Sequence, residues 1–229
     1  MKSHLFNEAS DLESQLVKDV LEALQEGIIL RGSASILFSG GSTPKKMLES
    51  LAAAPFDWRN VKVGLVDDRM VPKTSSASNA NLLHAHFLDR IRGEAPKFYP
   101  LVEWEDESQN IDAAMQSVEA IGKPDVVVLG MGTDGHTASF FPGGDNLEAA
   151  TSPTTNRLFL SMLAPGAQEP RITMTLPCLT SARNLFLHIE GEEKLRVYEE
   201  ALEDGPADDL PIRHVLRHPD VNLHVYWAP

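Results

Sequence analysis

Residues 34–48, ASILFSGGSTPKKML, join an apolar run to a glycine-rich turn and the start of a helix. The run at 34–38 predicts a short buried strand. Pro44 suits the first position of a helix, and Thr43 suits the cap before it. The apolar face of this helix is formed by Met47, Leu48 and Leu51. A strand, a turn and a helix in this order open an α/β unit.

The same alternation of apolar strands and amphipathic helices continues along the chain. Further strands are predicted at 61–66, 125–129, 157–163, 184–189 and 221–227. Helices are predicted over Leu12–Leu24, where Gly27 is expected to break the pattern, and at 78–91, 110–121 and 192–202. Apolar strands between helices are typical of a parallel sheet covered on both faces. The predicted fold class is therefore α/β, a Rossmann-like three-layer α/β/α arrangement with a mostly parallel sheet.

Length and composition favour one α/β domain over residues 1–229, with 42% hydrophobic and 23% charged residues. The formal net charge is −13, and no Lys/Arg stripe offers a basic face to nucleic acid or to a membrane surface. No apolar stretch approaches the roughly 20 residues that span a bilayer. Cys178 is the single cysteine, so an internal disulfide and a CxxC metal pair are excluded. We expect a cytoplasmic protein that is a monomer or a weak homo-oligomer.

Three polar clusters follow three of the predicted strands. Because ligands sit beyond the carboxyl ends of the strands in open parallel sheets, we expect the clusters to meet in one crevice. The first is Ser39-Gly40-Gly41-Ser42-Thr43. Its small residues and the following helix N-terminus favour a phosphate, although an ordinary strand-to-helix turn has the same pattern. It is neither a Walker motif nor a GxGxxG motif.

The second cluster is Asp67-Asp68-Arg69. A surface ion pair is the commoner reading of such a triplet. At the end of a strand, however, Arg69 is placed to bind a phosphate or carboxylate, and Asp67 to orient a hydroxyl or a base.

The third cluster, residues 134–139, holds Asp134 and His136. An imidazole with an unperturbed pKa of about 6.5 is suited to general base catalysis near neutral pH. Asp134 is placed to fix its tautomer. His136 follows a Gly-x-Gly turn after a buried strand, which favours a functional role over a structural one. His136, Asp134 and Asp67 are therefore the candidate catalytic residues.

Six segments together resemble the 6-phosphogluconolactonase family. They are FSGGSTP at 38–44, DDRMVP at 67–72, Ser78-Asn79, LGMGTDGHTASFFPG at 129–143, PRITMT at 170–175 and GEEK at 191–194. The order matches that of the family, and the segment at 129–143 is similar to its most specific motif.

The resemblance implies the fold of sugar phosphate isomerases and deaminases. It also implies hydrolysis of 6-phospho-D-glucono-1,5-lactone to 6-phosphogluconate, the second step of the oxidative pentose phosphate pathway, without a cofactor or a metal. In the family, the histidine matching His136 is the proposed base, and the residues matching Arg69 and Lys194 are associated with the substrate phosphate. We add Arg171 as a candidate cation, although its place after Pro170 predicts a loop where a surface arginine is the alternative. Lys194 is expected on the exposed start of a helix.

The chain departs from the family at two places. The family usually has Asp-Glu-Arg where Asp68 stands here, so no role is assigned to Asp68. It often ends in an aromatic-Leu-Asp segment, whereas this chain ends VYWAP at 225–229.

Two other functions stay open on the sequence. One is a glucosamine-6-phosphate deaminase or isomerase, a family that tends to show Asp-Glu-Tyr at 67–69 and Asn-Glu-Pro at 140–142. The other is a sugar phosphate sensor without catalytic activity, which reuses this fold.

Overall fold

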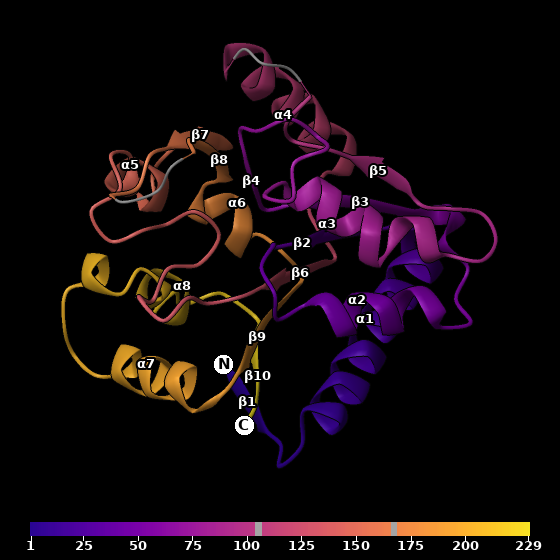
Figure 1. Cartoon of the computed structure of the whole chain (residues 1–229), viewed down its shortest axis with the longest axis horizontal. Coiled ribbons are helices and arrows are strands. Elements are labelled where there is room, and N and C mark those ends of the chain that lie inside the picture. The colour runs from indigo at the N-terminus through magenta and orange to yellow at the C-terminus, as the bar shows by residue number, and fades with distance from the viewer. Residues whose placement is uncertain (104–106, 166–168) are drawn as a thin grey trace.

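A seven-stranded parallel sheet forms the centre of the computed structural model, which describes residues 1–103, 107–165 and 169–229 (Figure 1). Its strands, in spatial order, are β1 (Lys2–Leu5), β10 (Leu223–Ala228), β9 (Asn184–Glu190), β6 (Val126–Leu129), β2 (Ala34–Phe38), β3 (Val61–Leu65) and β5 (Lys97–Tyr99). All neighbouring pairs run parallel. The prediction of a mostly parallel α/β sheet is confirmed.

A three-stranded antiparallel sheet stands beside the large one. Its order is β4 (Asp67–Arg69), β8 (Arg171–Met174) and β7 (Phe159–Met162). The sequence did not predict this sheet, nor strands β1, β5 and β8. These strands have only three or four residues each. Strand β4 consists of charged residues and therefore shows no alternation of apolar and polar residues.

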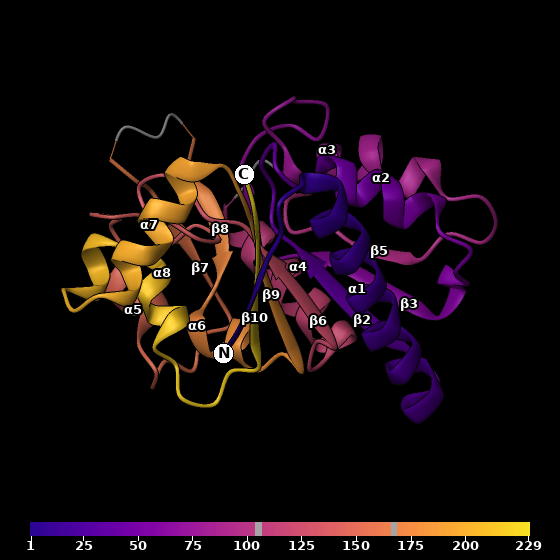
Figure 2. The ribbon, with the colours of Figure 1, turned by 90° about the horizontal axis from the view of Figure 1, so that it is seen from below.

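Helices cover both faces of the large sheet. They are α1 (Ala9–Arg31), α2 (Lys45–Ala53), α3 (Asn79–His86), α4 (Glu107–Ile121), α5 (Leu147–Thr151), α6 (Leu176–Thr180), α7 (Glu192–Leu202) and α8 (Ile212–Leu216). The 3₁₀ turns are η1 (Trp58–Asn60), η2 (Leu88–Arg90) and η3 (Ala207–Asp209). Helices α1 and α2 lie on one side of the sheet, and α7 and α8 with the small sheet lie on the other (Figure 2).

The predicted apolar stripe of α1 faces the sheet. Leu12, Leu16, Val20 and Leu24 are completely buried, as are Ile36 and Phe38 of β2. Burial of each such side chain stabilises the fold by about 1.5–3 kcal/mol. This packing fixes the central strands, and with them the loops at their ends.

The three strands that carry the polar clusters are neighbours in the order β6-β2-β3. Phe38, the last residue of β2, is in register with Leu65 of β3 and Val128 of β6. Since the strands are parallel, the segments that follow them leave the sheet at one edge. The expectation that the clusters share this edge is confirmed.

Helix α1 does not break at Gly27, contrary to the prediction. The helix continues to Arg31 and ends at Gly32, whose φ of 76° is left-handed. Gly27 is buried because α1 passes close to β2 there: a Cβ on it would lie 2.8 Å from the Cβ of Ala34. Close approach of a helix to a strand, and not helix termination, explains this glycine.

Among the described residues, no helix combines the length and the apolar character needed to cross a bilayer.

Replacing Gly27 by alanine tests this packing. In an open helix, Gly→Ala stabilises by about 1 kcal/mol. Here the added methyl group meets Ala34, so we expect Gly27→Ala to lower the free energy of unfolding by about 1–3 kcal/mol. Urea unfolding measures the change, with Glu26→Ala on the exposed side of the helix as the control. A more stable Gly27→Ala protein would contradict the close approach.

Candidate active site

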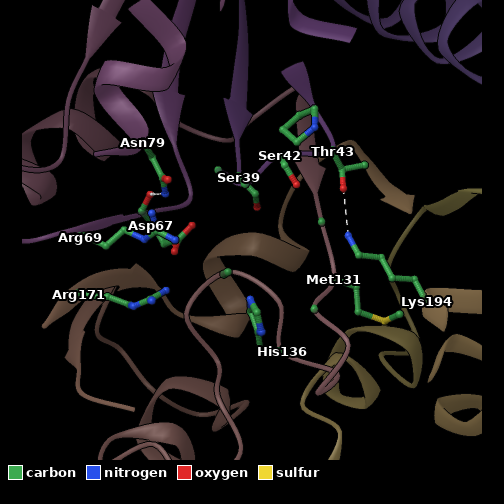
Figure 3. A pocket seen from close by; sticks show the side chains of 16 residues that line it. Ser39, Ser42, Thr43, Asp67, Arg69, Asn79, Met131, His136, Arg171 and Lys194 are labelled. Carbon is green, nitrogen blue, oxygen red and sulfur yellow. Dashed lines mark hydrogen bonds between the residues drawn. The ribbon is translucent and has the colours of Figure 1, made fainter. Parts of the chain in front are cut away.

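One pocket lies at the edge of the sheet where β6, β2 and β3 end, with a cavity of about 240 Å³ (Figure 3). It is lined by Ser39, Gly40, Gly41, Ser42, Thr43, Pro44, Asp67, Arg69, Asn79, Gly130, Met131, Gly132, His136, Ala138, Arg171 and Lys194. Every candidate residue predicted from the sequence is among them except Asp134. Asp134 does not line the pocket but contacts the Nδ1 atom of His136. The structure therefore brings the candidates together, while their roles stay predictions.

The glycine-rich loop presents its backbone to the pocket. Ser39 N–H still bonds to Val128 O in the sheet (2.9 Å), but among the described residues no acceptor takes the N–H groups of Gly41, Ser42 and Thr43. Ser39 Oγ is also buried without a partner there. Free donors at the N-terminus of α2 form an environment suited to an anion.

Gly40 lets this loop lie against Asn79. A Cβ at Gly40 would fall 1.8 Å from Asn79 Oδ1, so no other residue fits there unless the loop or the Asn79 side chain shifts. The Asn79 amide in turn donates to Asp67 O (2.9 Å). Asn79 was not predicted as a site residue, although Ser78-Asn79 stands among the segments that resemble the family.

Thr43 does not cap α2 as predicted. Pro44 occupies the cap position in a helical conformation and makes no side-chain cap hydrogen bond. Thr43 Oγ1 instead accepts a hydrogen bond from Lys194 Nζ (3.0 Å). Lys194 lies in the first turn of α7 and is half-buried, not exposed as predicted. Burial lowers the pKa of the Lys194 ammonium, and Glu190 opposes that shift.

Two arginines stand side by side on the opposite side of the pocket (Figure 3). Arg69 on β4 is the register partner of Arg171 on β8. Arg171 therefore belongs to a strand, and the predicted loop is wrong. Antiparallel pairing with β4 makes Arg171 the first residue of β8. Arg69 Nη1 donates to Ala77 O (2.6 Å), which turns the guanidinium along the pocket wall.

Like charges directly opposite one another on a sheet destabilise it. Burial and the nearby Arg69 charge lower the pKa of Arg171. Its Nε is buried and has no hydrogen-bond partner among the described residues. A bound anion would relieve both the repulsion and the missing hydrogen bond.

Asp67 faces this arginine pair from the end of the β3–β4 segment. Its carboxylate is buried, and Ser139 Oγ donates to Oδ2 (2.6 Å). Burial raises the pKa of Asp67, although Ser139 and the two arginines act in the opposite direction.

Asp68 points away from the pocket and anchors helix α3. Its side chain is fully buried and accepts hydrogen bonds from the backbone N–H groups of Asn79 (2.7 Å), Ala80 (3.1 Å) and Arg69 (2.8 Å). Burial raises the pKa of Asp68 to about 6 against these three donors, and the Asp67 charge adds to the rise. Asp68 thus holds the start of α3, and with it Asn79, at the pocket wall.

His136 lies between the arginine pair and Lys194, on the segment after β6 (Figure 3). Its Nδ1 is 2.6 Å from Asp134 Oδ1, and its backbone N–H donates to the same oxygen (3.1 Å). Burial raises the pKa of Asp134, but the hydrogen bond and charge of His136 outweigh it and leave that pKa below its ordinary value. Gly132 makes room for the pair, since a Cβ there would lie 2.2 Å from His136 Nδ1.

The residues after His136 are tied to the rest of the pocket. Thr137 Oγ1 donates to Gly130 O (2.8 Å), and Ser139 N–H donates to Thr173 Oγ1 (3.2 Å). Ala138 has a φ of 49°, and it is the only non-glycine residue of the described chain with positive φ. Such conformations persist only where their surroundings impose them, and they cluster at functional sites.

A model of the family described as glucosamine-6-phosphate isomerases/6-phosphogluconolactonase matches residues 7–227. The chain is 45% identical over 228 residues to a 6-phosphogluconolactonase of Rhizobium meliloti, covering 99% of this chain and 98% of the relative. It is 41% identical to a second 6-phosphogluconolactonase, of Mesorhizobium japonicum, over 98% of this chain and 94% of the relative. A crystal structure of a 6-phosphogluconolactonase from Shewanella baltica superposes with a TM-score of 0.94 at 37% identity, covering 100% of this chain and 98% of the other.

The buried Asp68 gives the protein a testable pH dependence. Its pKa of about 6 lies above the ordinary value of 3.8, so its contribution to stability is present below pH 4 and is lost as the pH rises through 6. Asp68→Asn cannot ionise. The stability of the wild type relative to Asp68→Asn should therefore fall by about 3 kcal/mol between pH 3.5 and pH 7.

Urea unfolding across this pH range measures the difference. Asp220→Asn, at an exposed aspartate, is the control and should show no such trend. A difference between wild type and Asp68→Asn that is independent of pH would contradict the raised pKa.

Proposed function

The chain belongs to the glucosamine-6-phosphate isomerase/6-phosphogluconolactonase family, and we propose that it hydrolyses 6-phospho-D-glucono-1,5-lactone to 6-phosphogluconate. The observation that carries the proposal is one pocket lined by His136, by the Gly41–Thr43 loop and by three cationic side chains. The backbone N–H groups of this loop have no acceptor in the described part of the chain. We place the reaction in the cytoplasm, as the second step of the oxidative pentose phosphate pathway.

The substrate phosphate is the anchor in this proposal. The candidates that hold it are the Ser39–Thr43 loop, Arg69, Arg171 and Lys194, all of which line the pocket. The chain carries a net charge of −13, which repels a phosphorylated substrate at long range. Screening limits that repulsion to roughly 8 Å at physiological salt, so the cations beside the pocket dominate near the site.

His136 is the base that activates water. With Nδ1 bonded to the Asp134 carboxylate, the proton of the neutral imidazole resides on Nδ1 and Nε2 is free to accept one. Water attacks the lactone carbonyl carbon while Nε2 takes its proton. The bond from this carbon to the ring oxygen then breaks, and the imidazolium returns the proton to that oxygen. The products are a hydroxyl group and a carboxylic acid that ionises in water.

The turn before His136 supplies donors for the oxyanion of the intermediate. Gly132 N–H and Gly135 N–H are already bonded, to His136 O (2.9 Å) and Gly132 O (3.1 Å). The N–H groups of Gly130 and Met131, which line the pocket, have no acceptor among the described residues. These two amides are therefore our candidates for the oxyanion hole.

Asp67 acts on the substrate hydroxyls in this proposal. Its Oδ2 accepts from Ser139, and its carboxyl group lines the pocket beside the two arginines. A buried carboxyl group at this place orients a hydroxyl by hydrogen bonding.

Removal of the imidazole tests the role of the base. We expect His136→Ala to lower kcat by about 10²–10⁴-fold, the contribution of a positioned general base. The lactone is generated in the assay with glucose-6-phosphate dehydrogenase, and acid release is followed above the spontaneous rate. The control is His84→Ala, which removes an exposed imidazole outside the pocket.

Full turnover by His136→Ala would reject the base assignment. Release of ammonia from glucosamine 6-phosphate by the wild type would favour a deaminase instead. Binding of 6-phosphogluconate without any lactone hydrolysis would favour a sensor.

Removal of one pocket cation tests the phosphate anchor. A charge-assisted hydrogen bond contributes about 1.5–3 kcal/mol, so we expect Arg69→Ala to raise KM about 10- to 100-fold. The matched control is Arg92→Ala, an exposed arginine away from the pocket. An unchanged KM in Arg69→Ala would show that Arg69 does not bind the phosphate.

A further inference from the structure

Phe141 does not line the pocket, yet its ring contacts two side chains that do. We propose that Phe141 is a positioning residue that holds the imidazole of His136 and the guanidinium of Arg171 against one aromatic ring. The inference deepens the proposed hydrolysis and rests on it, because it explains how the base and a pocket cation keep a fixed spacing.

The first contact is with the base. The rings of His136 and Phe141 stack with centroids 4.4 Å apart and planes 28° apart. The hydrogen bond to Asp134 fixes Nδ1 but leaves the ring able to rotate about that bond. One third of the His136 side chain is exposed, so part of the ring faces solvent and not packed side chains. The stack supplies the second restraint and sets the direction in which Nε2 points.

The second contact is with the cation. The guanidinium carbon of Arg171 lies 4.5 Å from the centroid of the Phe141 ring, within the range of a cation–π interaction. Within residues 1–103, 107–165 and 169–229, no hydrogen bond or ion pair to the Arg171 side chain is present, and its Nε is buried without a partner. The aromatic ring is thus the contact that orients this guanidinium in the described part of the chain.

The backbone explains why Phe141 reaches both groups. Ala138, at a φ of 49°, reverses the chain, and Phe140 N–H bonds to Thr137 O (2.9 Å) to close the turn. Phe140 is fully buried in the core, and its packing holds the turn in a fixed position. Phe141, the next residue, is therefore brought back over His136, five positions earlier in the chain.

A fixed ring has consequences for both kinetic constants. If the imidazole tilts, the attack of water loses alignment and kcat falls, since a misplacement of about 1 Å can cost about 100-fold. If the guanidinium is released, the pocket loses a fixed cation and KM rises. An apolar side chain that only fills space would affect stability and leave both constants unchanged.

The test compares Phe141→Leu with Phe141→Tyr. Leucine keeps an apolar side chain but removes the aromatic face, whereas tyrosine keeps the face. We expect Phe141→Leu to lower kcat about 10-fold or more and to raise KM about 2- to 30-fold, the range of a cation–π contact. Phe141→Tyr should stay within about two-fold of the wild type. Phe56→Leu, at a half-buried ring that packs edge-on against Trp58 away from the pocket, is the matched control and should change neither constant.

Nuclear magnetic resonance gives a readout that does not depend on turnover. The ring protons of His136, assigned by their loss in His136→Gln, should carry the ring-current shift of Phe141. That shift should disappear in Phe141→Leu and persist in Phe141→Tyr.

Each outcome decides between the alternatives. Wild-type kcat and an unchanged His136 spectrum in Phe141→Leu would overturn the inference, as would equal losses in the leucine and tyrosine variants. If the wild type does not hydrolyse the lactone, the proposed function fails whatever Phe141→Leu does. If His136→Ala keeps full turnover, the base assignment fails and the positioning role of Phe141 fails with it. If His136→Ala is inactive and Phe141→Leu behaves as the wild type, only the role of Phe141 is rejected.

Discussion

The parallel alignment of β6, β2 and β3 is the constraint on which the pocket depends. Since parallel neighbours end at the same edge, the segments after them meet in space although they lie far apart in the chain. The glycine-rich loop, the Asp67–Arg69 segment and the turn that carries His136 are those three segments. The buried apolar strands and the completely buried stripe of α1 fix the register that keeps them in contact.

The small antiparallel sheet supplies the wall of the pocket that the large sheet leaves open. Strand β4 directly follows β3, and β8 pairs with β4 from a segment about a hundred residues later in the chain. That pairing brings Arg171 beside Arg69 and makes the pocket cationic on one side, while Lys194 of α7 makes it cationic on the other. A protein of net charge −13 thus concentrates positive charge where an anionic ligand would bind.

Several features of the pocket cost stability. Two arginines face each other, two neighbouring carboxyl groups are buried at 67 and 68, and Ala138 has a left-handed backbone. Each is held by contacts around it, such as the three backbone donors to Asp68 and the hydroxyl of Ser139 on Asp67. Unfavourable arrangements retained by surrounding structure are typical of sites where ligands bind or reactions occur.

The sequence by itself determined the α/β class, most strand positions and ten of the sixteen residues that line the pocket. These follow from local patterns: apolar runs, the spacing of α1, and small or charged residues directly after strands. It also determined that His136 and Asp134 pair, because two positions in a tight turn are close whatever the fold. Gly27 shows the limit of such patterns. The sequence cannot distinguish a glycine that ends a helix from a glycine that lets a helix pack closely against a strand.

Only the tertiary structure decided the β4–β8 pairing, the anchoring of α3 by Asp68, the bond of Lys194 to Thr43 and the contacts of Phe141. In each case the partners are set by packing between distant segments, or by a turn whose direction depends on that packing. Sequence spacing carries no information about such contacts, because the energy that selects them arises only when the whole core is assembled.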